Sequence, residues 1–166
     1  KPDLICCGKG MGGGVALSGV IGKKNIMDLP STGEMSSTNS ANPLACAAGM
    51  TVIDEINNKK ILKKVNENGK YLKTGLDAIM HRNSMSIKYV MGKGMIYALI
   101  FDNKIKNIGI KLKKVCFRAM QNGLLLVYTG RESIKIGPPL TISKKAIKEG
   151  LKVLEEQISK VLKNSN

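Results

Sequence analysis

The sequence predicts a mixed α/β protein, with the end of an α/β layer in front and a smaller α+β domain behind. Two observations favour this division. A buried-strand pattern at Leu4–Cys7 leads directly into a glycine-rich loop, and open α/β sheets bind their ligands at the carboxyl ends of strands. After residue 86, strand patterns and amphipathic helices alternate. We therefore expect two domains, residues 1–60 and 61–166.

The composition is that of an ordinary globular protein, with 43% hydrophobic and 23% charged residues in a chain of 166. No apolar run is long enough to cross a bilayer, and the start does not resemble a signal peptide. The four cysteines form no C-x-x-C pair, so we expect no metal site and place the protein in the reducing cytoplasm. Because the chain begins without Met at the threshold of a strand, we expect a fragment of a longer protein.

The net charge of +15 raises the alternative of a basic nucleic-acid-binding module. Only three of the 27 basic residues are arginine, the residue that base-edge readout favours. Two Phe and four Tyr leave few rings for base stacking. We therefore expect a solvated lysine-rich surface and no nucleic-acid partner.

The front of the chain is expected to hold one more strand, one helical turn and a polar loop. Val15–Ile21 has a strand pattern that stops at Gly22, and Lys23–Asp28 fits a single helical turn. The segment Ser31–Asn42 is small and polar. It predicts either a flexible loop or a hydroxyl-rich loop that binds an anion beside a helix start.

Two helices are expected to connect the domains. Asn42 suits an N-cap and Pro43 the first helical position, while small residues such as Gly49 predict close packing against a neighbour. Asn57-Asn58 interrupts the pattern, and a second helix is expected over Ile61–Ile79.

The back of the chain predicts a hairpin, two further strands and two helices. The hairpin joins Ser86–Val90 to Met95–Phe101, and the first helix is expected over Lys111–Gln121, capped by Gly123. The further strands are expected at Leu124–Tyr128 and Ser133–Ile136. The last helix starts at a Thr141 or Ser143 cap and carries one apolar stripe, Ile147, Leu151, Leu154, Ile158 and Leu162.

The most informative residue is Lys9, a lysine between glycines at the end of the first strand. Gly8 to Gly13 matches G-x-G-x-x-G, but a dinucleotide loop needs a helix to start within the glycines, where this sequence continues toward a strand. A lysine in this position suits Schiff-base chemistry with a carbonyl cofactor. The residues alone leave that role and a plain surface lysine equally open.

Three motifs in order decide between these two interpretations. They are Pro2–Ile5 with Gly8-Lys9-Gly10-Met11-Gly12-Gly13-Gly14, then Leu17–Val20, then Ser37-Thr38-Asn39-Ser40-Ala41-Asn42-Pro43-Leu44-Ala45. With Gly92–Met95, Asn122–Leu125 and the late Pro138-Pro139-Leu140, the whole chain resembles the class III aminotransferases that use pyridoxal phosphate.

The resemblance implies a fold type I transferase, of which this chain is the C-terminal part of the large domain plus the small C-terminal α+β domain. It implies that Lys9 forms the Schiff base with pyridoxal phosphate and then moves the substrate proton as general base. Thr38, with its neighbour Ser37, matches the position that contacts the cofactor phosphate, usually from the other subunit of a homodimer. The substrates implied are an amino-acid or amine donor and a 2-oxo acid acceptor.

Two departures from the family pattern stand out. The family's N-terminal phosphate loop and the aspartate that pairs with the pyridine nitrogen precede the lysine and are absent from this sequence, so we expect weak or no activity from the isolated chain. An arginine that holds the substrate carboxylate in some members is Lys135 here, with Arg131 as a nearby substitute. The expected function is transamination. The alternatives are a non-catalytic remnant, one half of a split aminotransferase that pairs with an N-terminal half, and the basic module.

Overall fold

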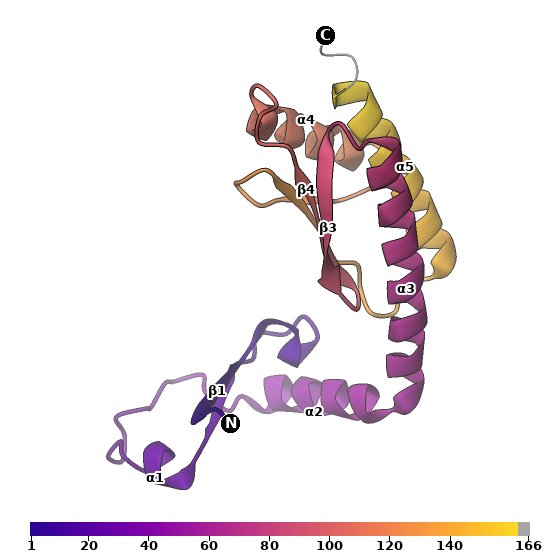
Figure 1. Cartoon of the computed structure of the whole chain (residues 1–166). Helices are drawn as coiled ribbons and strands as arrows, with labels where there is room; N and C mark the ends of the chain where they lie inside the picture. The colour runs from indigo at the N-terminus through magenta and orange to yellow at the C-terminus, as the bar shows by residue number, and fades with distance from the viewer. Residues whose placement is uncertain (163–166) are drawn as a thin grey trace. The chain divides into compact units, whose positions relative to one another are not determined.

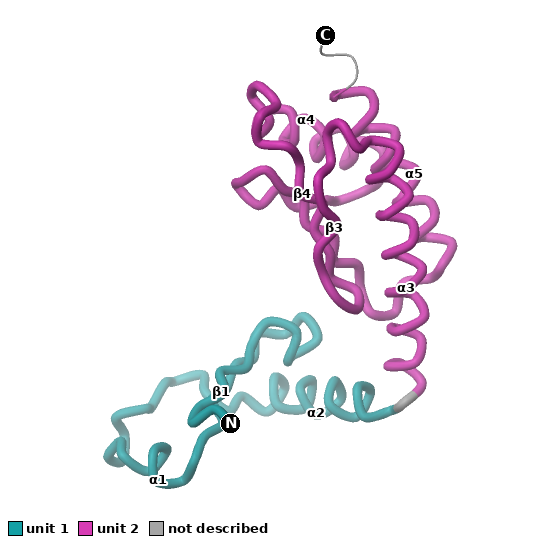
Figure 2. Tube along the Cα trace, viewed as in Figure 1, with its two compact units in different colours: residues 1–59 teal, residues 60–166 magenta. Residues whose placement is uncertain are grey.

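The computed structural model describes residues 1–162, apart from the side chain of Lys59. The chain divides into two units, residues 1–59 and 60–166, each with its own internal packing (Figure 2). It is a mixed α/β chain with two separate sheets, of two and four strands.

A two-stranded ribbon opens unit 1. β1 (Leu4–Cys7) pairs antiparallel with β2 (Gly19–Gly22), and Cys7 lies opposite Gly19 (Figure 1). The first strand was predicted correctly, but the second begins at Gly19 and not at Val15. The reason is the connection, in which a 3₁₀ turn, η1 (Lys9–Gly12), is followed by the hydrogen bond from the Val15 amide to Gly12. Residues 8–18 reverse the chain before the ladder can start.

The rest of unit 1 follows the sequence prediction. α1 (Lys24–Met27) is a single turn, and the polar segment after it consists of turns. α2 (Pro43–Asn57) starts as expected, because Asn42 Oδ1 accepts hydrogen bonds from the Leu44 and Ala45 amides at 3.0 and 3.4 Å.

The predicted close packing of α2 is also confirmed. Gly49 is buried, and a Cβ at this position would lie 2.5 Å from Leu17 Cδ2. The glycine therefore lets α2 approach the connection between the two strands of the ribbon.

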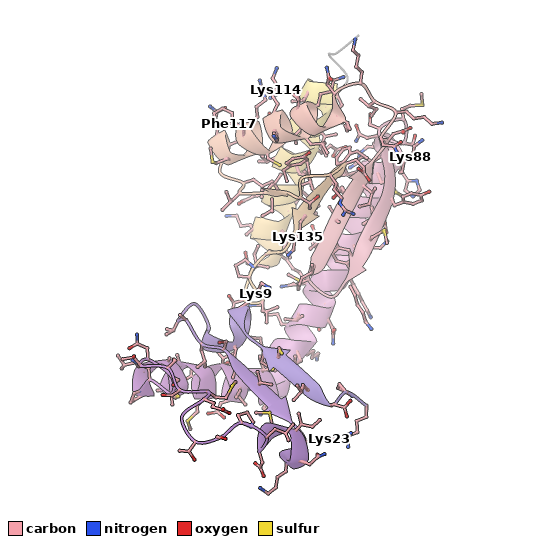
Figure 3. All side chains as sticks on the ribbon, turned by 90° about the vertical axis from the view of Figure 1, so that its left-hand side faces the viewer. Lys9, Lys23, Lys88, Lys114, Phe117 and Lys135 are labelled. Atoms are coloured by element: carbon pink, nitrogen blue, oxygen red, sulfur yellow. The ribbon has the colours of Figure 1, made fainter. Side chains whose placement is uncertain are left out.

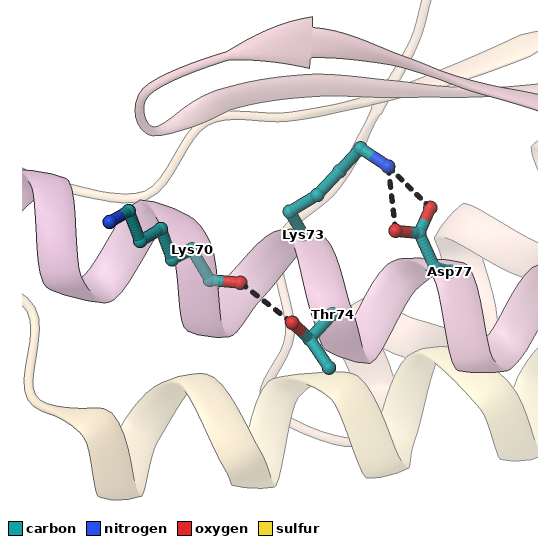
Figure 4. A network of polar contacts seen from close by, with 4 residues as sticks. All are labelled: Lys70, Lys73, Thr74 and Asp77. Carbon is teal, nitrogen blue, oxygen red and sulfur yellow. Dashed lines mark hydrogen bonds and ion pairs between the residues drawn. The ribbon is translucent and has the colours of Figure 1, made fainter.

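Unit 2 begins with the long helix α3 (Lys59–Arg82), which the extended backbone of Asn58 separates from α2. Figure 4 shows a polar network along it, in which Lys73 Nζ donates to both carboxylate oxygens of Asp77 at 2.6 Å. In the same network, Thr74 Oγ1 donates to the carbonyl of Lys70 at 3.1 Å. These contacts satisfy polar groups one turn apart on the helix.

A four-stranded antiparallel sheet forms the other layer of unit 2. Its strands are β3 (Ile87–Lys93), β4 (Ile96–Phe101), β5 (Val127–Tyr128) and β6 (Ser133–Ile136), in the order β3-β4-β6-β5. The predicted hairpin is confirmed, since β3 and β4 pair antiparallel. β5 is shorter than predicted, and the amide of Leu124, the first residue of the predicted strand, donates instead to the carbonyl of Ala119.

Two helices complete unit 2. α4 (Ile108–Gln121) starts three residues before the predicted position, and Gly123 follows it with φ of +81°. α5 (Lys144–Leu162) starts as predicted after Ser143, whose Oγ accepts from the Ala146 amide at 3.1 Å.

The core of unit 2 lies between the helices and one face of the sheet. Alternate residues of β4 point into it, and Leu76, Leu112, Leu154 and Ile158 meet them from the three helices. The core also encloses the Gln157 amide, whose Oε1 accepts from Arg118 Nε at 3.1 Å. Among residues 1–162, Gln157 Nε2 has no hydrogen-bond partner.

Two of the glycines that lie within helices, Gly69 and Gly150, provide a matched test of this packing. A Cβ at Gly69 would lie 2.3 Å from the Gly94 carbonyl oxygen, whereas at Gly150 the nearest atom, on Leu124, would be 3.4 Å away. We expect Gly69→Ala to lower the free energy of unfolding by about 1–3 kcal/mol. Gly150→Ala should raise it by up to about 1 kcal/mol through helix propensity. Urea denaturation measures both, and a stabilised Gly69→Ala variant would contradict the close contact.

Asp102, just beyond β4, gives a pH-dependent prediction. Lys88 Nζ lies 2.9 Å from its carboxylate, and this hydrogen bond, followed by one from the Lys104 amide, lowers the pKa of Asp102. The stabilisation is therefore present above the unfolded pKa of about 3.9 and is lost as pH falls through the lower folded value. Asp102→Asn should be less stable than the unmodified chain at neutral pH, with the difference closing below about pH 4.

Urea denaturation at neutral and acidic pH measures this difference. Lys88→Met removes the other partner and should show the same dependence. A difference for Asp102→Asn that stays constant across this pH range would show that the carboxylate charge is not the cause.

Candidate functional site

Unit 1 contains a pocket of about 500 Å³ between three segments of the chain. The segments are η1, the stretch before β2, and the polar loop that runs into α2. The lining residues are Lys9, Ala16, Leu17, Ser18, Ser37, Asn39, Ser40, Ala41, Asn42 and Ala45. The volume is in the range of small-molecule and cofactor sites.

Lys9 enters this pocket from a strained backbone position. Its φ is +50°, in the left-handed region that costs a residue with a Cβ about 1–2 kcal/mol. The strain follows from the fold, because the chain leaves β1 at Cys7 and turns at once into η1. Strained residues of this kind cluster at functional sites, so the backbone itself marks Lys9 as a candidate.

Ser18 is a lining residue that the sequence analysis did not single out. The ribbon brings it beside the Lys9 loop, since a Cβ on Gly8 would be 3.6 Å from Ser18 Cβ. A usable signal was present, because Ser18 is the only hydroxyl residue within the apolar stretch 15–21.

The polar loop contributes Ser37, Asn39 and Ser40 to the lining. A tight turn orders them, in which the Ser40 amide and Ser40 Oγ both donate to the Ser37 carbonyl, at 3.1 and 2.7 Å. Of the two predicted phosphate contacts, Ser37 lines the pocket, while Thr38 is exposed in the same turn and is not among the lining residues. The sequence located this loop but not which of its hydroxyls face the pocket.

The start of α2 is not an open anion site. The Asn42 side chain already accepts the two amides that a bound anion would use. The Ser40 hydroxyl is already committed to the Ser37 carbonyl, so the side-chain donors left for an anion in this pocket include the amine of Lys9, the hydroxyls of Ser18 and Ser37, and the amide of Asn39. Leu17 and Ala45 supply an apolar wall beside them.

The two residues predicted to hold a substrate carboxylate belong to unit 2. Lys135 stands on β6 and is exposed on the sheet, where the register places Ala98 and Val127 on either side of it (Figure 3). Arg131 is exposed in the turn that leads into the same strand. Neither residue takes part in an ion pair within residues 1–162.

Other kinds of site were also considered. Within the described part of the chain, no three His, Cys, Asp or Glu side chains are grouped so as to hold a metal ion. In the same residues, no helix has the length and apolar character needed to cross a membrane.

Similarity to known proteins covers nearly the whole chain. The family described as Aminotransferase class-III matches residues 1–158. A leucine/methionine racemase from Thermococcus litoralis is 37% identical over 165 residues, which covers 97% of this chain and 37% of the racemase. An acetylornithine aminotransferase from Caldanaerobacter subterraneus subsp. tengcongensis is 28% identical over 160 residues, covering 96% of this chain and 39% of that enzyme.

Solved structures agree with this match. The crystal structure of acetylornithine aminotransferase from Elizabethkingia anophelis has a TM-score of 0.81 and 27% identity, covering 98% of this chain and 41% of that one. The chain thus spans less than half the length of each of these relatives.

The left-handed backbone at Lys9 leads to a testable difference between two variants that both lack the amine. Glycine adopts this conformation without a Cβ clash, so Lys9→Gly should be more stable than Lys9→Ala by about 1 kcal/mol. At exposed Thr51 inside α2 the order should reverse, with alanine favoured over glycine by about 1 kcal/mol. Urea denaturation compares each pair, and an alanine preference at both sites would rule out strain at Lys9.

Proposed function

Because the chain belongs to the class III aminotransferase family, we propose that it is the part of a pyridoxal-phosphate enzyme that carries the cofactor lysine. The observation that carries this proposal is the position of Lys9, which occupies a strained backbone conformation and lines a pocket of about 500 Å³. In this proposal residues 1–60 belong to the large cofactor-binding domain and residues 61–166 form the small C-terminal domain.

The residues of the pocket fit the cofactor. Pyridoxal phosphate, when bound, supplies a carbonyl that reacts with amines and a ring that withdraws electrons from the substrate α-carbon. The amine of Lys9 is the group that holds the carbonyl end, and the hydroxyl of Ser37 and the side-chain amide of Asn39 are donors suited to phosphate oxygens. Thr38 is a further phosphate contact in this proposal. Leu17 and Ala45 give a wall from which water is excluded.

Lys9 would have a second role, as the group that transfers the substrate proton. Its free amine takes a proton from the substrate α-carbon as general base and returns one as general acid. In transamination the amino group moves from an amino donor to a 2-oxo acid. Lys135 and Arg131 are the cations that we propose for the substrate carboxylate, Arg131 with the fork that matches two oxygens and Lys135 as a point charge.

Racemisation is the second candidate function. The observation that favours it is the 37% identity over 165 residues to the leucine/methionine racemase from Thermococcus litoralis. Lys9 serves this reaction too, but the proton has to reach both faces of the α-carbon. In both functions Lys9 takes the proton from the substrate α-carbon. The functions differ in the atom that accepts the returned proton.

The ribbon of unit 1 supports a further proposal, that the active enzyme needs more than these residues. Apolar side chains are exposed on both faces of the two strands, with Leu4 at 45%, Ile5 at 49% and Ile21 at 63%. A two-stranded ribbon is too small to be stable alone, and strands that are apolar on both faces are usually covered on both sides. We propose that the remaining part of the family fold covers it and that the assembled enzyme is a cytoplasmic homodimer.

The experiment is covalent trapping of the cofactor. The chain is incubated with pyridoxal phosphate, reduced with borohydride, digested and examined by mass spectrometry. We expect selective labelling of Lys9 and none at that site in Lys9→Ala. Lys23, an exposed lysine paired with Asp3 at 2.5 Å, is the control, and Lys23→Ala should leave the labelling of Lys9 unchanged. Equal labelling of many surface lysines would contradict the proposal.

The reaction type is tested by supplying the part of the family fold that this chain does not span. The chain is co-expressed with the portion of a class III relative that it does not span, and chiral chromatography and 2-oxo acid consumption are followed together. Transfer of the amino group to the oxo acid supports transamination, whereas interconversion of L- and D-amino acid without it supports racemisation. A complex that binds the cofactor but does neither would favour the non-catalytic remnant.

A further inference from the structure

Unit 2 has a groove of about 600 Å³ on its surface that plays no part in the chemistry proposed above. Every residue that lines it belongs to α3 or α5. These helices run side by side in the same direction (Figure 1), and two contacts join them. A Cβ on Gly75 would lie 2.3 Å from Leu151 Cδ1, and Arg82 Nε donates to Glu155 at 2.5 Å.

The floor of the groove is apolar, and two of its residues are small. Ile79 is buried and Leu151 half-buried at its base, while Gly75 and Ala78 present little side chain above the α3 backbone. Gly75 makes room for Leu151 of this chain, and the small side chain of Ala78 leaves space above the floor for a larger apolar side chain of a partner. A pair of adjacent helices with such a floor is the surface on which an amphipathic helix packs.

The rim of the groove is strongly basic on one side. Lys145, Lys148 and Lys152 recur at i, i+3 and i+7 and so share one face of α5, where all three are exposed. None of the three takes part in an ion pair within residues 1–162. Of the two carboxylates in the lining, Glu155 is held by two hydrogen bonds from Arg82, so the groove carries a net positive charge.

We propose that this groove binds an amphipathic helix with acidic flanks, presented by a partner protein. The apolar side of that helix packs on Ala78 and Leu151. Its carboxylates pair with the groove lysines Lys145, Lys148 and Lys152. An apolar centre with a charged rim is the pattern of an interface that forms between separate proteins.

Two other occupants fit less well. A second copy seated on the groove through the same face would bring the two sets of groove lysines together, and like-charge repulsion disfavours that arrangement. A single-stranded nucleic acid binds best where its bases can stack on aromatic rings, and the groove has an apolar aliphatic floor, two carboxylates and no aromatic residue among its lining residues.

The test uses the full chain and a synthetic helical peptide about five turns long, with leucine at i, i+3, i+4 and i+7 and glutamate at the flanking positions. Fluorescence anisotropy measures its dissociation constant. Reversing the three groove lysines (Lys145→Glu, Lys148→Glu, Lys152→Glu) should weaken binding by about tenfold or more. Filling the floor with Ala78→Leu, which leaves the charge unchanged, should also weaken it.

A matched control changes the same net charge elsewhere. Lys106→Glu, Lys113→Glu and Lys114→Glu, on or beside α4, should leave the dissociation constant within about threefold. A peptide with lysine in place of glutamate should not bind. The proposal is overturned if the two triple reversals weaken binding equally. It is also overturned if Ala78→Leu, with an unchanged thermal transition, has no effect on binding. A third contrary result is a single-stranded RNA that binds more tightly than the acidic peptide and no longer binds to the groove variant.

Discussion

The antiparallel pairing of β1 with β2 is the constraint on which the candidate site depends. Because Cys7 lies opposite Gly19, residues 8–18 have to reverse the chain within a short span. The reversal uses a 3₁₀ turn and places a lysine, rather than a glycine, in left-handed backbone. The same reversal brings Ser18 back beside the lysine loop. The strain at Lys9 and the composition of the pocket thus have one cause.

The pocket also depends on how closely α2 approaches this connection. The absence of a side chain at Gly49 lets the helix lie against Leu17, and Leu17 is in turn part of the pocket wall. At its other end, α2 is capped by Asn42, another lining residue. One residue therefore ends the polar loop, starts the helix and borders the site.

Unit 2 is built on a different principle, a sheet with helices packed on one face and a continuous apolar core between them. Glycines again set the closest approaches, with Gly69 against the β3–β4 turn and Gly75 against α5. The packing that brings α3 and α5 together at Gly75 also shapes the groove on their outer surface. A structural contact thereby creates a surface that can be recognised.

Local chemistry was enough to determine most of the elements. The cap at Asn42, the proline at the first position of α2, the glycine after α4 and the apolar stripe of α5 each act over a few residues, so their positions could be predicted. The family could likewise be recognised from motifs that are continuous in the sequence.

Tertiary structure decided the rest. β2 starts later and β5 is shorter than predicted, and at each predicted strand start a hydrogen bond of a reversal or a helix end takes the first amide, that of Val15 or Leu124. Lys9 shares the pocket lining with residues from other segments of the chain, such as Ser18 and Ser40. Only the folded ribbon and loop bring these segments together. Residue type shows which chemistry is available, but the direction of a side chain depends on the backbone around it. For this reason the lysine and the polar loop could be singled out from the sequence, whereas Ser18 and the choice among the hydroxyls of the loop could not.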